Sequence, residues 1–220
     1  MNFLTILKIL LILALPFLLF LIVLNFVGFD NLFYQEKFSE YNVQEKVPEA
    51  SSLHEKVINF IKGTNDKLPD ELGEREKQHL LDVRNITRIS TIVLYALIIL
   101  FILLLLISAF ILKVNNSITN FVGKVLVFGG FLTITLAAAL FFFISSDFSG
   151  AFESFHKLLF EKGTYTFDPA KEVIVKLYPE QLFMDLGIKI SKWAVIISIV
   201  IVFIGIFLIF KSKKIKRSVK

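Results

Sequence analysis

The chain has 220 residues, 55% of them hydrophobic, and its mean hydropathy of +0.73 is too high for an ordinary soluble domain. It contains no cysteine, which excludes disulfides, thiolate metal sites and a cysteine nucleophile. The formal net charge is +5. The unpaired basic residues flank apolar runs, so we attribute this charge to membrane topology and lipid contact rather than to nucleic-acid binding.

Four apolar segments without acidic residues are long enough to cross a membrane as helices. About 20 residues at 1.5 Å per residue cover the roughly 30 Å of hydrocarbon in a bilayer. The predicted spans are Phe3–Phe26, Ile92–Leu112, Val125–Ile144 and Trp193–Phe210. The first is interpreted as a retained span, because its apolar run is too long for a signal peptide and no A-x-A site follows. The sequence predicts an all-α membrane protein, a single polytopic domain over 1–220 with four transmembrane helices.

The distribution of charge predicts the orientation of these spans. All 19 acidic residues fall in two outer segments, 27–91 and 145–192, which also hold 15 basic residues and so carry a net charge of −4. The other nine basic residues are Lys8, Lys113, Lys124 and six in the tail "KSKKIKRSVK". The positive-inside rule places both termini and the 113–124 loop in the cytoplasm of a cell-membrane protein. The two outer segments are then expected to form an extracellular cap.

Two helices are predicted in the first outer segment. In "SLHEKVINFIKG", Ser52 as N-cap and Glu55 at the third helical position match a capping box, and the helix is expected to end at Gly63. Its apolar stripe consists of Leu53, Val57, Phe60 and Ile61. His54 is expected to be solvated on this helix. After a loop, a second helix from Glu74 is expected to continue into the second span without a break.

The second outer segment begins with a largely aromatic stripe at helical spacing, formed by Phe152, Phe155, His156, Leu159 and Phe160. A short helical or irregular piece is expected between Pro169 and Pro179. Trp193 is expected to anchor the last span at the membrane interface. Both outer segments are too short to form cores of their own, so we expect them to pack on each other.

Two histidines are candidates for chemistry. His79 and Asp82 are i, i+3 neighbours, and a carboxylate there can fix the imidazole tautomer and raise its basicity. The phenylalanines around His156 would exclude water and strengthen a hydrogen bond to a developing charge. From spacing alone, a polar interface role for these histidines carries more weight than catalysis. Asp82 equally fits an ion pair with Arg75 or Arg88.

Other kinds of site find less support. His79, Asp82 and His156 could reach one metal ion, but no H-x-x-x-H or H-E-x-x-H spacing supports a metal site, and we predict neither a metal nor a cofactor. The serines near His156 lack a G-x-S-x-G turn. Lys8 is the only charged residue within the spans, which argues against a proton relay or a coupled transporter.

The two histidine-centred stretches resemble the lipoprotein intramolecular transacylase (Lit) family. They read "EREKQHLLDVRNI" before the second span and "FESFHKLLFEKGTYTFDPAKEVIVKLYPEQLF" after the third, and the four-span layout is similar as well. The resemblance implies an acyltransferase that acts on lipoproteins whose N-terminal cysteine bears a diacylglyceryl group. It would move the sn-2 acyl chain to the cysteine's own α-amino group and leave a lyso-form lipoprotein. Gly73, Leu80 and Tyr165 depart from the family pattern but keep its capping, apolar and aromatic character.

The same resemblance implies that His79 and His156 are catalytic. A substrate α-ammonium with a pKa near 8 must lose a proton before it attacks an ester, and imidazole is suited to accept that proton. We expect His79 to be the general base, oriented by Asp82, and His156 to stabilise the oxyanion, although the reverse assignment fits equally well.

The remaining residues of the two motifs are expected to support this site. Those expected to shape the substrate pocket are Phe155, Phe160, Tyr165 and Phe167. Those expected to support the catalytic residues without contacting the substrate are Asp82, Arg75, Asp168 and Glu180. The expected partners are diacylglyceryl-modified lipoproteins and membrane lipid, and no nucleic acid.

The alternative is a non-enzymatic membrane sensor or assembly factor whose outer cap binds a partner. The histidines would then be interface residues or a pH switch. The separation of the two imidazoles discriminates between the hypotheses. An enzyme needs them close together over a lipid-accessible cleft, whereas a binding protein does not.

Overall fold

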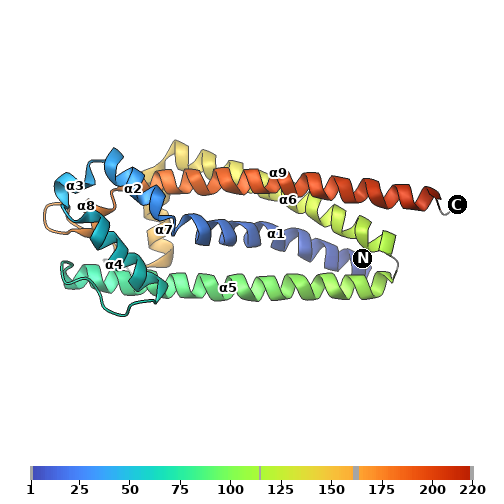
Figure 1. Ribbon diagram of the computed structural model, residues 1–220, viewed down its shortest axis with the longest axis horizontal. Coiled ribbons are helices and arrows are strands. Elements are labelled where there is room, and N and C mark those ends of the chain that lie inside the picture. The colour runs from blue at the N-terminus through green and yellow to red at the C-terminus, as the bar shows by residue number, and fades with distance from the viewer. Residues whose placement is uncertain (1, 114, 161–163, 219–220) are drawn as a thin grey trace. The chain divides into compact units, whose positions relative to one another are not determined.

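The computed structural model describes residues 2–113, 115–160 and 164–218, and within these the regular structure is entirely helical (Figure 1). The helices are α1 (Phe3–Val27), α2 (Asn31–Glu40), α3 (Val43–Lys46), α4 (Ala50–Lys62), α5 (Glu74–Leu112), α6 (Asn115–Ser146), α7 (Phe148–Leu159), α8 (Ile174–Leu177) and α9 (Glu180–Ser218). The predicted all-α fold is confirmed.

Four of these helices, α1, α5, α6 and α9, are long and apolar enough to cross a membrane. The prediction of a multi-pass membrane protein with four transmembrane helices is therefore confirmed. At 39 residues, α5 and α9 are about twice the length that a bilayer requires. The extra length of α5 lies in its polar first turns, which run from Glu74 into the apolar stretch without a break, as expected.

The chain divides into two compact units, each described here by itself. The bundle unit consists of Met1–Leu24, Val93–Phe142 and Lys189–Lys220. The polar unit consists of Asn25–Ile92 and Phe143–Ile188, so it contains both histidine motifs.

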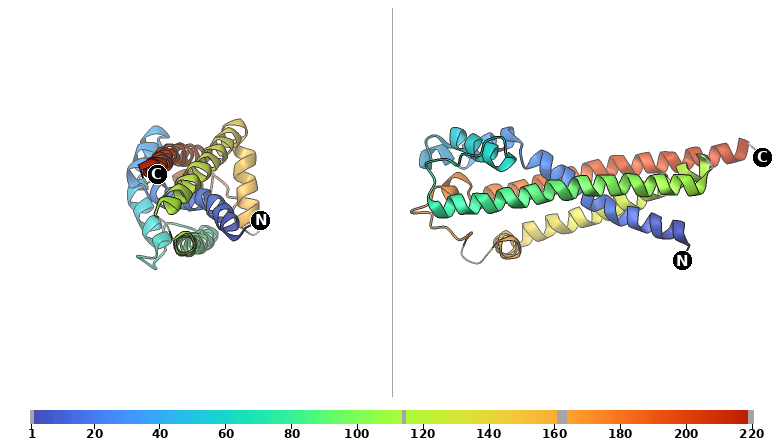
Figure 2. Two further views of the ribbon diagram at one scale, coloured as in Figure 1. Left: turned by 90° about the vertical axis from the view of Figure 1, so that its right-hand side faces the viewer. Right: turned by 90° about the horizontal axis from the view of Figure 1, so that it is seen from below.

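In the bundle unit, small residues let the long helices approach closely. A Cβ added to Gly123 or Gly205 would lie 2.8 Å from the carbonyl oxygen of the other glycine, so only glycine fits this crossing of α6 and α9. Figure 2 shows α6 running obliquely across the other long helices of the unit. Large side chains such as Phe110, 78% exposed, and Phe203, 67% exposed, point outward. Such surfaces suit contact with lipid tails.

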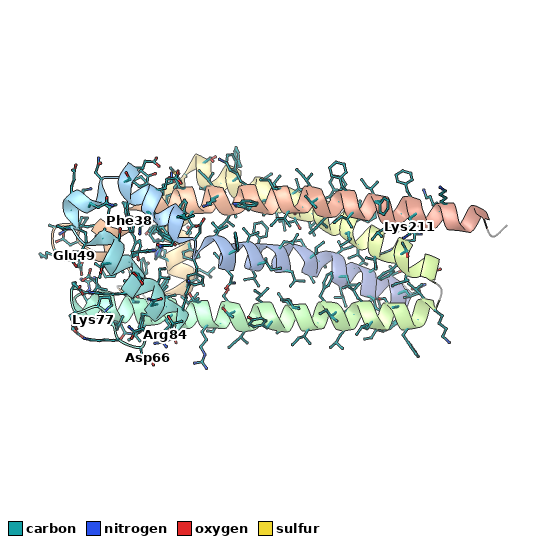
Figure 3. The ribbon with its side chains drawn as sticks, in the orientation of Figure 1. Phe38, Glu49, Asp66, Lys77, Arg84 and Lys211 are labelled. Atoms are coloured by element: carbon teal, nitrogen blue, oxygen red, sulfur yellow. The ribbon has the colours of Figure 1, made fainter. Side chains whose placement is uncertain are left out.

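In the polar unit, the two outer segments pack on each other. One cluster joins Phe38 of α2, which is fully buried (labelled in Figure 3), to Leu177 of α8 and Leu182 of α9. A second cluster joins Phe60 of α4 and Leu80 of α5 to Ile174 of α8. Their burial against each other gives this unit the shared core that neither segment forms alone. The extracellular side remains a prediction.

The start of α4 differs from the prediction. The helix begins at Ala50, after Glu49 as N-cap, and no side chain caps it. The expected capping box of Ser52 and Glu55 is therefore wrong. Ala50 is fully buried in the cluster around Phe38, and burying it extends the helix beyond the predicted start. The helix ends as predicted at Gly63, whose φ of +74° is the left-handed conformation that glycine adopts most readily.

Candidate active site

The first turn of α5 is fixed by a buried carboxylate. Glu76 is only 2% exposed, and its two oxygens accept hydrogen bonds from the backbone N–H groups of Gly73 (2.6 Å) and Ile174 (2.7 Å). The first bond is half of a capping box, and the second ties α5 to α8. Glu76 was not among the predicted site residues, although its position three residues after Gly73 indicates a capping role. His79 follows one turn later on the same helix.

His79 is packed among aromatic rings and is 8% exposed. Its ring centroid lies 4.8 Å from that of Phe160 and 5.3 Å from that of Phe167. Burial, helped by the proximity of His156, lowers the pKa of His79 to about 4, against a smaller opposing effect of Asp82. At neutral pH, His79 is therefore an uncharged imidazole.

Asp82 was expected to orient His79 and to raise its basicity. Its carboxylate accepts a 3.4 Å hydrogen bond from Gln78, and among the described residues no hydrogen bond joins it to His79. The Nδ1 atom of His79 is buried and, over the same described residues, has no hydrogen-bond partner. Because burial outweighs the influence of Asp82, the pKa of His79 is lowered rather than raised. Asp82 raises the pKa of His79, the direction expected of it, but this effect is smaller than the lowering caused by burial.

His156 lies in α7, which starts after Asp147, whose side chain accepts a hydrogen bond from Gly150 N–H. The Nδ1 atom of His156 is 2.7 Å from the carbonyl oxygen of Phe152. A carbonyl can only accept, so Nδ1 carries the proton and the Nε2 lone pair of the neutral ring is free of this bond. Burial lowers the pKa of His156, and the hydrogen bond to Phe152 opposes that shift.

The structure brings the two histidines together. Their ring centroids are 6.3 Å apart, and the ring planes differ by 22°. Phe160 contacts both, since its ring lies 5.3 Å from that of His156. The rings of Phe155 (5.4 Å) and Tyr165 (5.3 Å) also pack on His156. All four residues expected to shape a pocket, including Phe167, thus contact one or both imidazoles.

Arg75 holds the segment that carries Phe167. Its guanidinium donates a 2.5 Å hydrogen bond to the carbonyl of Thr166, lies 3.4 Å from a carboxylate oxygen of Glu172, and covers the Phe167 ring at 5.6 Å. Asp168 stabilises the same segment, because its side chain accepts a hydrogen bond from the N–H of Ala170. Both residues therefore support the site through the segment on which Phe167 lies.

Glu180 has a different position. At the start of α9, its carboxylate accepts a 2.6 Å hydrogen bond from the hydroxyl of Ser149 near the start of α7. It therefore links the helix that bears His156 to α9. Within the described part of the chain, no recorded hydrogen bond or ion pair joins Glu180 to either of the two histidines.

The third histidine, His54, is buried, contrary to the expectation of a solvated residue. It is 1% exposed, its Nδ1 is 2.9 Å from the hydroxyl oxygen of Tyr178, and its ring packs against that of Tyr34 at a centroid distance of 4.3 Å, tilted by 36°. Burial lowers the pKa of His54 to about 4. A row of rings, Tyr178, Phe183 and Phe152, connects His54 to His156 through centroid distances between 4.1 and 6.2 Å. The apolar stripe predicted for α4 did not indicate that His54 is buried. The helices α2 and α8 cover a wider part of the surface of α4 than that stripe.

A metal centre finds no support in this arrangement. Over residues 2–113, 115–160 and 164–218, no group of three or more His, Asp or Glu side chains is placed to hold a metal ion. The donors at the site are two uncharged imidazoles surrounded by aromatic rings, a set suited to proton transfer and hydrogen bonding.

Comparison with known proteins identifies the family. No curated protein sequence matches the chain. The fold is similar to that of the membrane-integral lipoprotein intramolecular transacylase Lit from Bacillus cereus, with a TM-score of 0.81, 23% identity and coverage of 96% of this chain and 97% of that one. Two structures of the Bacillus cereus protein with a histidine replaced by arginine or alanine give TM-scores of 0.78 at the same identity, with 96% of this chain and 93% and 95% of theirs covered. The sequence profile of the lipoprotein intramolecular transacylase Lit family matches residues 9–183, and the chain therefore belongs to that family of membrane proteins.

Proposed function

We propose that this protein moves the sn-2 acyl chain of a diacylglyceryl-modified lipoprotein to the α-amino group of the same lipoprotein's N-terminal cysteine. Family membership supports the class of substrate and reaction. The observation that carries the proposal is the pairing of His79 and His156, which lie on different helices and come within 6.3 Å of each other among aromatic rings. A binding protein has no need for this proximity.

In the proposed reaction, the neutral α-amine attacks the carbonyl carbon of the sn-2 ester. A C–N bond forms, the ester C–O bond breaks, and the proton lost by nitrogen ends on the glycerol oxygen. The products are an amide and a free hydroxyl in the same molecule, at unchanged total mass. Because donor and acceptor belong to one molecule, no acyl-enzyme is needed, and the protein's main contribution is to hold them in a reactive geometry.

The geometry favours His156 as the general base, the reverse of the first assignment. Its Nδ1–H is committed to the Phe152 carbonyl, so its Nε2 lone pair is the atom that accepts the proton from the amine. The lowered pKa keeps the ring neutral at pH 7, which is the form that a base requires. The same nitrogen then returns the proton to the departing glycerol oxygen.

His79 is proposed to stabilise the oxyanion of the tetrahedral intermediate. Because its pKa is lowered to about 4, it acts as a neutral N–H donor rather than as an imidazolium. A donor held in a water-poor environment is worth much more than the same donor in water. Phe160, which packs on both imidazoles, contributes to excluding water.

The proposed location follows from charge and exposure. We propose that both termini lie in the cytoplasm of a cell-membrane protein and that the polar unit lies outside, where the acyl ester of an exported lipoprotein meets water. Phe155 is 53% exposed beside His156, which makes it a candidate contact for an acyl chain. The distribution of basic residues supports this orientation.

The test is the N-terminal lipopeptide of a reporter lipoprotein in a host whose lipoproteins carry two acyl chains and a free amine. Expression of this protein should move one acyl chain to nitrogen at unchanged mass, which fragment masses reveal. His79→Ala and His156→Ala should abolish the change, while Lys157→Ala, an exposed residue next to His156, should not. Full activity of both histidine variants, or an unchanged free amine with the wild-type protein in the membrane, would overturn the proposal.

A further inference from the structure

The bundle unit contains a cavity that the proposed reaction does not use. Its volume is about 230 Å³, and it lies where the first turns of α1, the end of α5 and the start of α6 meet. Figure 1 shows the start of α1, the end of α5 and the start of α6 at the same end of this unit. The lining residues are Lys8, Leu112, Ser117, Asn120, Phe121 and Lys124.

Two cations line this cavity without a counter-ion from the protein. Neither Lys8 nor Lys124 forms an ion pair with any residue that the structure describes. The ranges that form this unit, 1–24, 93–142 and 189–220, contain no aspartate or glutamate in the sequence. Unpaired ammonium groups close to hydrocarbon are costly, so an external anion has a favourable site here.

The other lining groups suit the rest of a lipid headgroup. Oδ1 of Asn120 is buried and, among the described residues, lacks a hydrogen-bond partner. Ser117 adds a hydroxyl in the first turn of α6, and the N-terminal turn of a helix favours a bound anion. Leu112 and Phe121 supply an apolar wall on which an acyl chain can lie.

We propose that this cavity binds the phosphate of an anionic phospholipid. Lys8 and Lys124 neutralise the phosphate, and the polar groups of Ser117 and Asn120 bind the headgroup hydroxyls. A lipid is favoured over dissolved phosphate because Lys8 lies five residues into an apolar helix, about 8 Å along its axis from the helix start. The lysine stem can bury itself there while its ammonium reaches the headgroup layer.

The test is native mass spectrometry of the full-length protein, purified in detergent with equal amounts of phosphatidylglycerol and phosphatidylcholine of the same chain length. The wild-type protein should retain one phosphatidylglycerol selectively. The double variant Lys8→Gln, Lys124→Gln should bind it about 30-fold more weakly, since each lysine near an anionic lipid strengthens binding severalfold. Lys8→Arg with Lys124→Arg should restore binding, which shows that loss in the glutamine variant is not a folding defect.

The matched control is Lys213→Gln with Lys214→Gln, which removes the same charge from exposed positions near the end of α9. Equal losses in the control and in the cavity variant would mean that only nonspecific charge attraction holds the lipid, and the proposal would fail. It would also fail if the cavity variant kept wild-type selectivity. In a third arm, inorganic phosphate is added without phospholipid, and protection of the fold equal to that given by phosphatidylglycerol would make the site one for free phosphate.

Discussion

The Nδ1–H of His156 donates a 2.7 Å hydrogen bond to the carbonyl oxygen of Phe152, one turn earlier in α7. This bond fixes which nitrogen of the neutral ring is the acceptor. His79 has no comparable anchor, because among the residues described its buried Nδ1 lacks a partner. The two imidazoles are therefore not equivalent, and substitutions at the two positions should differ in their effects.

Glutamine substitutions separate the two roles. His79→Gln keeps an N–H donor, so we expect it to retain part of the activity that His79→Ala loses, a loss on the order of 10²- to 10³-fold. His156→Gln has no basic nitrogen and should be as inactive as His156→Ala, with losses of about 10²- to 10⁴-fold. Rates of N-acylation measured on a purified lipopeptide test this ranking. If His156→Gln were the more active of the two glutamine variants, His79 would be the base.

The pH dependence of the rate should follow the pKa of the substrate amine rather than the ordinary pKa of a histidine near 6.5. Burial lowers the pKa of His79 to about 4 and lowers that of His156 below its ordinary value, so both rings are mainly neutral at pH 6.5 and above. The substrate amine, with a pKa near 8, is deprotonated only as the pH rises. We expect rates that increase up to about pH 8 and show no separate step near 6.5. A clear step at pH 6.5 that disappears in His156→Gln would contradict the burial of that ring.

The features of this site that follow from local sequence periodicity could be predicted, whereas those that depend on contacts between distant residues could not. Helical periodicity placed Leu53, Val57 and Phe60 on the buried face of α4, because a 3.6-residue repeat is a property of the sequence alone. The burial of His54 beside them depends on Tyr178, far away in the chain, so no local pattern contains it. The Phe152 bond of His156 depends on a side-chain rotamer chosen by the surrounding rings.

For Asp82, the spacing predicted the direction of its effect on the pKa of His79 but not its size relative to the effect of burial. The i, i+3 spacing correctly put it near His79, yet its oxygen accepts a hydrogen bond from Gln78, and its charge is outweighed by the burial of the imidazole. Spacing reports proximity but not the degree of desolvation, which is set by the packing of Phe160 and Phe167 from the other outer segment.

Burial of His54 makes stability sensitive to acid. Its pKa is lowered to about 4 in the folded protein and is near 6.5 in the unfolded chain. The unfolded state therefore binds the proton more tightly, so stability is full above pH 6.5 and is lost as the pH falls toward 4. The difference corresponds to a contribution on the order of 3 kcal/mol.

We expect His54→Phe to reduce the fall in melting temperature between pH 6.5 and 4, because phenylalanine has no charge to gain. Thermal unfolding in detergent at several pH values measures this effect. His79→Phe is a useful comparison, since the pKa of His79 is lowered to a similar value and the same change should follow. An unchanged pH dependence in the His54→Phe protein would mean that other groups cause the loss of stability.

Glu76 should be important for stability and for the position of His79. Glu76→Gln leaves one acceptor for two buried backbone donors, those of Gly73 and Ile174, and turns an N–H₂ group toward one of them. We expect a loss of about 2–4 kcal/mol, because an unsatisfied buried polar group and a lost charged hydrogen bond both contribute. The matched control is Glu74→Gln, in the same turn, where the side chain is 92% exposed. Equal melting temperatures of the two variants would show that the buried carboxylate contributes little.

Arg75 should control the segment that carries Phe167 without contacting either imidazole directly. Arg75→Ala removes the bond to the Thr166 carbonyl, the pairing with Glu172 and the contact with the Phe167 ring. We expect faster hydrogen exchange over 164–172 and a loss of activity on the order of 10- to 100-fold, because small displacements of a site are costly to rate. Arg75→Lys should be intermediate, since lysine keeps the charge but not the planar, multiply bonding group.

Arg84→Ala is the control for this experiment. Arg84 lies on the same helix, pairs with Asp66 at 2.5 Å and covers the Phe60 ring at 4.7 Å, so it holds the other loop of the polar unit (both charged residues are labelled in Figure 3). Its loss should speed exchange around Asp66 and leave 164–172 protected. If both arginine variants loosened 164–172 equally, the effect would be a general destabilisation of the unit. A selective effect of Arg75 would instead connect the order of this segment to the rate of acyl transfer.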